Sequence, residues 1–114
     1  MVIIAIILIS LAVLIGAYLL KFVFKEKHPP KAFVFAHGAF AILGILVLFI
    51  YALTTEEHHK HWDSIAIFSV AAVGGLYMFS KDIRHKNVPR WVAVVHAVIA
   101  LFGLVWILSH ILNE

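Results

Sequence analysis

The sequence predicts an all-α protein, a four-transmembrane-helix bundle made of two tandem helical-hairpin repeats. Its composition is typical of a membrane protein, because 64% of the residues are hydrophobic and only 13% are charged. The apolar residues fall into four segments of about 20 residues, the length that a membrane-spanning helix needs. The second half of the chain also repeats the first at a constant offset of 59 residues. We therefore expect residues 1–114 to form a single integral membrane domain.

The four apolar segments are expected to be helices, because none shows the alternation of apolar and polar residues that a transmembrane strand needs. The first segment, 2–20, lacks the basic start and the small-residue cleavage site of a signal peptide, so we interpret it as a retained helix. The second and fourth segments, 32–53 and 91–112, are long enough to tilt. The third, 62–79, is the shortest.

The charged residues predict the orientation in the membrane. Eight of the nine basic residues lie in two connectors, 21–31 and 81–90. The opposite end carries four acidic residues against one lysine: Glu56, Glu57, Asp63 and Glu114. The positive-inside rule then places both basic connectors in the cytoplasm, with both termini and the loop 54–63 outside. We expect a bacterial inner membrane with periplasmic termini, and no nucleic acid among the partners.

The internal repeat brings two histidines to the same depth. Residues 8–53 align with 67–112 without a gap, as repeat 1 and repeat 2, and ten positions are identical. These positions predict a duplicated hairpin whose halves are related by a pseudo-twofold axis along the membrane normal, so that the second and fourth helices run parallel. Three of the identical pairs form a triplet with seven-residue steps: Pro30 with Pro89, His37 with His96, and Gly44 with Gly103.

Histidines inside a membrane usually have a function, and this pair has the chemistry of axial haem ligands. Each lies about 10 Å along its helix from the preceding proline, and small residues follow on the same face, where a macrocycle needs space. With no cysteine in the chain, thiolate metal sites and covalent c-type haem are excluded. The candidate residues for binding one haem b are His37, His96, Ala41, Gly44, Ala100 and Gly103.

This arrangement resembles membrane b-type cytochromes, namely the haem-bearing half of cytochrome b and the four-helix cytochrome b561 class. The segments Pro30-x6-His37-Gly38-x5-Gly44 and Pro89-x6-His96-x6-Gly103 carry the resemblance. It implies electron transfer, with quinone and a redox partner protein as candidate partners beside the lipid bilayer. Diheme members have a second histidine about fourteen residues further along each ligand helix. Those positions hold Tyr51 and His110 here, so one haem is expected.

A second candidate site lies at the acidic end of the predicted bundle, where three histidines and three carboxylates occur in the ten residues 54–63. The loop could bind Zn²⁺ or Cu²⁺ together with the histidine that ends the fourth helix. The alternatives are a second haem, held by that histidine and one from the loop, and a solvated connector without a ligand. The candidate residues are His58, His59, His61 and His110.

Other functions receive less support from the residues. The main alternative is a non-haem structural or accessory subunit, or a homo-oligomeric scaffold, in which the two membrane histidines make only structural hydrogen bonds. A small transporter is disfavoured because no Asp or Glu lies in the cores of the apolar segments. Nothing indicates catalysis beyond electron transfer, so we expect either an electron-transfer protein or a subunit of a quinone-linked oxidoreductase.

Overall fold

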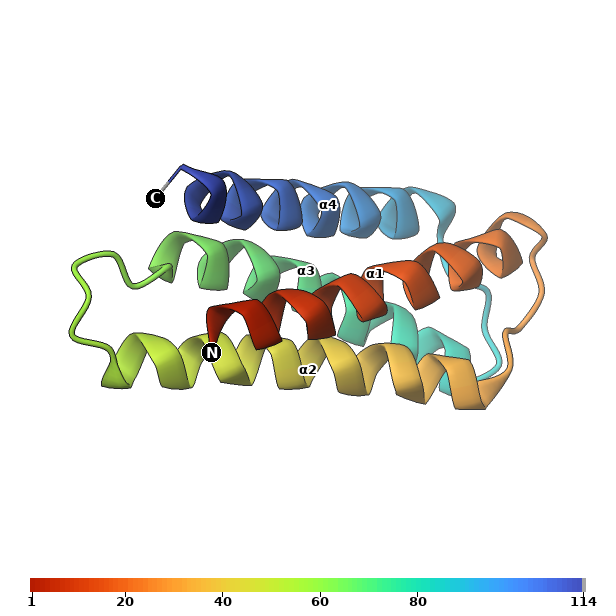
Figure 1. The fold of residues 1–114 in the computed structure, drawn as a ribbon. Coiled ribbons are helices and arrows are strands. Elements are labelled where there is room, and N and C mark those ends of the chain that lie inside the picture. Colours follow the sequence, from red (N-terminus) through yellow and green to blue (C-terminus); the bar gives the residue numbers. More distant parts are fainter. Residues whose placement is uncertain (114) are drawn as a thin grey trace.

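The structure, a computed structural model, is an elongated bundle of four helices (Figure 1). It describes residues 1–113, and Glu114 lies outside them. The helices are α1 (Val2–Phe24), α2 (Lys31–Thr54), α3 (Trp62–Ile83) and α4 (Arg90–Leu112). Within the described residues no strand accompanies them. The all-α, four-helix prediction is confirmed. The proposed duplication of the hairpin stays a prediction.

Two of the helices extend further than predicted. α1 and α3 each continue four residues past the expected ends at 20 and 79, because the lysines and serine that follow the apolar runs are compatible with a helix. Both helices stop at a residue in the left-handed conformation, Glu26 with φ of 54° and His85 with φ of 56°. The N–H of the next residue then donates back to a carbonyl of the last turn, as in a Schellman motif. The distance is 2.9 Å both from Lys27 to Phe22 and from Lys86 to Lys81.

The helices pack in a ring, in which α1 contacts α2 and α4, and α3 also contacts α2 and α4. The pair α2 and α4 therefore lies across the diagonal of the bundle. Both of these helices begin directly after a proline, Pro30 and Pro89, whose fixed φ suits a helix start. In Figure 1 the two chain ends and the loop between α2 and α3 lie at one end of the bundle, and the other two connectors lie at the opposite end.

The side chains are distributed as expected for a bundle surrounded by lipid. Leu48 and Ile107 are fully buried in the centre. Large apolar side chains point outward on every helix, and Leu14 and Val73 are each 69% exposed. All four helices are long and apolar enough to cross a membrane. The chain is accordingly described as an integral membrane protein.

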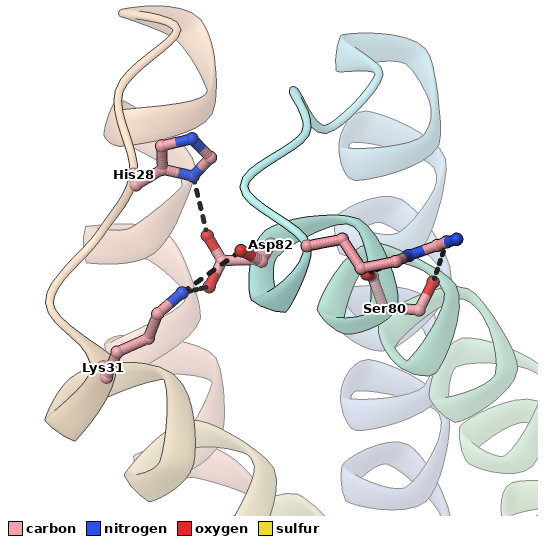
Figure 2. A network of polar contacts seen from close by, with 5 residues as sticks. His28, Lys31, Ser80 and Asp82 are labelled. Atoms are coloured by element: carbon pink, nitrogen blue, oxygen red, sulfur yellow. Dashed lines mark hydrogen bonds and ion pairs between the residues drawn. The ribbon is translucent and has the colours of Figure 1, made fainter.

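A polar network closes the bundle at the end that holds the two basic connectors (Figure 2). The Asp82 side chain, in the last turn of α3, is only 6% exposed. One of its carboxylate oxygens accepts a hydrogen bond from His28 Nδ1 at 3.1 Å, and the other pairs with the ammonium group of Lys31. The buried carboxylate thus ties α3 to the α1–α2 connector and to the start of α2, which makes Asp82 a structural residue.

Candidate functional site

His37 and His96, called here the central pair, come from the diagonal helices α2 and α4 and meet between them. Their ring centroids lie 6.2 Å apart, with the ring planes at 80°. Two imidazoles bound to opposite sides of one metal ion by bonds of about 2 Å, the length of a Zn–His bond, would have their centroids about 6 Å apart. The separation of the central pair therefore matches that of two axial ligands.

The neighbouring helices hold both rings in the same way. His37 Nδ1 lies 2.7 Å from the carbonyl oxygen of Ala12 on α1, and His96 Nδ1 lies 2.7 Å from that of Ala71 on α3. Because a carbonyl can only accept a hydrogen bond, each Nδ1 must carry the proton. The lone pair of each neutral ring is then on Nε2, the atom that a metal ion would bind.

The glycines that touch the imidazoles lie on α1 and α3, and they were not among the predicted site residues. A Cβ atom at Gly16 would lie 2.8 Å from Cε1 of His37, and one at Gly75 would lie 3.2 Å from Cε1 of His96. Each glycine follows the residue whose carbonyl accepts the hydrogen bond, Ala12 or Ala71, by four positions, so the carbonyl and the glycine share one helix face. The repeat matched both glycines, and this was the signal in the sequence that could have identified them.

The predicted small residues have other neighbours. A Cβ at Gly44 would lie 2.5 Å from the side chain of Ile9, and one at Gly103 would lie 2.9 Å from Ile67 and from Phe68. These two glycines therefore allow α2 to approach α1 and α4 to approach α3. Ala41 and Ala100 are half-buried on the ligand helices.

A second group of ligand-type side chains gathers at the end of the bundle that holds the chain termini. Called here the end cluster, it consists of His59 from the α2–α3 loop, Asp63 from the first turn of α3 and His110 from the last turn of α4. One ligand atom from each lies within 4.8 Å of the other two. The sequence predicted both histidines as candidate residues and indicated the carboxylates of residues 54–63 as possible ligands, without singling out Asp63.

The remaining histidines of the predicted second site differ in position. His61 is only 1% exposed, and its ring centroid lies 4.4 Å from that of His59 and 6.4 Å from that of His110. The planes of the His61 and His110 rings meet at 80°, much as in the central pair. His58 is exposed on the loop and is not part of the cluster.

The residues of the central pair fit a b-type haem in their donor chemistry. Two neutral imidazoles, each with its tautomer fixed by a carbonyl, form the ligand set of bis-histidine haem iron. Comparison of the chain with protein-family models, curated proteins and solved structures gives no match. The geometry of the central pair and of the end cluster is therefore the basis for inferring a function.

Proposed function

We propose that the chain is a small membrane b-type cytochrome that transfers single electrons through one haem b, with His37 and His96 as axial ligands. The single observation that carries the proposal is the convergence of the two imidazoles from diagonal helices, 6.2 Å apart. Polar groups are costly within a bilayer, and the carbonyls of Ala12 and Ala71 account for only one nitrogen of each ring, so the two Nε2 atoms favour a ligand role over chance.

The residues around the pair contribute orientation and environment. The carbonyls of Ala12 and Ala71 fix the ring tautomers and make each imidazole a better donor. Gly16 and Gly75 leave the two ring edges free of side-chain bulk. The haem, when bound, supplies the one-electron chemistry, and the apolar bundle tunes its potential by excluding water. A ligand pair that fills both axial positions leaves none for oxygen.

The proposal includes an orientation and partners. The positive-inside rule favours a cytoplasmic position for the connectors that hold Lys27 and Lys86. The central pair, which lies nearer to these connectors, would then be in the cytoplasmic half of the membrane. Quinone, a soluble donor or an attached enzyme would then exchange electrons there. Because the chain has no cysteine, single cysteines at positions 58 and 86 would report the orientation. A membrane-impermeant maleimide applied to intact cells should label position 58 only. Labelling of position 86 alone would contradict the proposed orientation and indicate the opposite one.

The test of the haem is spectroscopic. The full chain, purified in mild detergent and supplied with haemin, should give a reduced-minus-oxidised difference spectrum of a b-type cytochrome with one haem per chain. His37→Ala and His96→Ala should each abolish this spectrum, because one imidazole cannot form the six-coordinate haem. His85→Ala is the matched control, since it removes a histidine from a connector and should leave the spectrum unchanged.

The competing function is that of a structural subunit without haem. The packing of Gly44 and Gly103 against α1 and α3 favours it, because tight helix contact alone explains those glycines. A protein that stays colourless with haemin while keeping its helical circular dichroism would support this alternative and contradict the cytochrome. Full haem retention in both alanine variants would contradict only the choice of ligands.

A further inference from the structure

The end cluster has the composition and geometry of a transition-metal site. We propose that His59, Asp63 and His110 together bind one divalent ion of the Zn²⁺ or Cu²⁺ class. The Nε2 atoms of His59 and His110 lie 3.9 Å and 4.0 Å from the two carboxylate oxygens of Asp63. Imidazole and carboxylate are the donors that these ions accept, and a set of two histidines and one acid leaves positions open for water.

The cluster joins two distant parts of the chain, because His110 on α4 meets His59 and Asp63, which lie four residues apart around the start of α3. Asp63 and His110 lie at the ends of α3 and α4, and His59 lies in the loop before α3. Tetrahedral coordination with bonds of about 2.0–2.2 Å places the donor atoms about 3.4 Å apart. The ligand atoms, which lie within 4.8 Å of one another, therefore have to approach by up to about 1.4 Å. Both histidine side chains would have to move, and they are partly exposed, at 42% for His59 and 34% for His110.

Trp106, one turn before His110 on α4, orients two of the ligands. Its carbonyl oxygen lies 3.0 Å from Nδ1 of His110 and accepts that proton, so the lone pair of the neutral ring is on Nε2. Its indole N–H donates to Asp63 at 2.6 Å and holds the carboxylate against the histidine. Asp63 also accepts a hydrogen bond from the N–H of Ser64 at 2.9 Å. Metal sites use such partners to fix their ligands before the ion binds.

A haem is the other group that this end of the bundle could bind, with His110 and His61 as its two histidine ligands. The two rings lie 6.4 Å apart, close to the spacing of the central pair. The ion is favoured because a carboxylate oxygen of Asp63 lies 4.0 Å from Nε2 of His110, and a carboxylate compensates the charge of a hydrated divalent cation. One Nε2 atom of His110 cannot serve both, so the two occupants exclude each other.

The test is a Zn²⁺ titration of the full chain, which is purified in detergent and first treated with a chelator. Isothermal titration calorimetry measures the binding. Wild type should bind one Zn²⁺ per chain and should show no measurable binding of Mg²⁺. His59→Ala, Asp63→Asn and His110→Ala should weaken binding by more than the ~10–100-fold that an outer partner contributes, and Trp106→Phe by about that amount. His58→Ala is the matched control, because it removes a loop histidine outside the cluster and should bind like wild type.

A measurement on wild type keeps the proposal testable if some of the variants fail to fold. Cu²⁺ bound to wild type should show electron paramagnetic resonance couplings from two imidazole nitrogens. The proposal is overturned if the His59→Ala and His110→Ala variants bind Zn²⁺ like wild type, or if His58→Ala weakens binding as much as they do, since the loop would then hold an adventitious ion only. A loss of half the haem in His110→Ala would also contradict it, because the haem would then occupy this end.

Discussion

The central pair and the end cluster use the same amino acid in two different environments. In both, a backbone carbonyl lies near Nδ1 of a histidine, at 2.7 Å in the central pair and at 3.0 Å for His110. The central pair lies between the four apolar helices without a carboxylate. The end cluster includes Asp63, and its side chains are 34–42% exposed.

This difference indicates which ligand each site can take. A divalent ion held by two neutral imidazoles inside a membrane would keep its whole charge in an apolar medium, which is costly. Haem brings its own compensation, because the porphyrin is a dianion, and its apolar surface suits the bundle. At the end of the bundle, water and Asp63 can compensate a free ion. Charge therefore favours the proposal of a haem at the central pair and of a divalent ion at the end cluster.

Among substitutions that keep both central histidines, the largest effect on haem binding is expected from filling the space beside the imidazoles. Gly16→Leu should weaken haem binding by about tenfold to a hundredfold, because its Cβ would lie 2.8 Å from a ring that is fixed by a carbonyl. Gly75→Leu, at 3.2 Å, should have a smaller effect. Gly38→Leu is the control, since nothing lies within 4 Å of a Cβ there. Haemin titration measures all three, and equal losses at positions 16 and 38 would show that the ring contact does not matter.

A smaller effect is expected at the opposite end, in the network of Asp82. Lys31→Met leaves the buried carboxylate with His28 alone, and this should destabilise the protein by about 1–3 kcal/mol. Thermal unfolding followed by circular dichroism measures the loss, and Lys27→Met, on the exposed connector, is the control. The haem and Zn²⁺ stoichiometries should not change, because this network stabilises the bundle without contributing a ligand. A changed stoichiometry would mean that the sites depend on the basic end.

The sequence predicted the fold well, because a bilayer admits few structures and the four apolar segments have the length of a membrane helix. The extra turns of α1 and α3 were missed because an apolar run ends where lipid contact ends, while a helix continues until a residue such as Glu26 or His85 adopts a left-handed conformation. The pairing of His37 with His96 remains the central sequence hypothesis, and the structure supplies a distance for it.

The less predictable parts of both sites depend on contacts between helices. Gly16 and Gly75 have no chemistry of their own, and only the packing of α1 against α2 and of α3 against α4 places them beside the imidazoles. In the sequence, nothing distinguished Asp63 from Glu56 and Glu57, the other acidic residues of the polar loop. Its place beside His110 depends on how the ends of α3 and α4 align, and Trp106 becomes its partner only in the folded bundle.

In our proposal the central pair alone holds the haem. Electron paramagnetic resonance of the ferric His59→Ala/His110→Ala double variant can test this assignment. We predict the same low-spin signal as in wild type, with one haem per chain, because both axial ligands remain. A high-spin signal, or loss of the haem in this double variant, would contradict the claim and assign the haem to the end of the bundle.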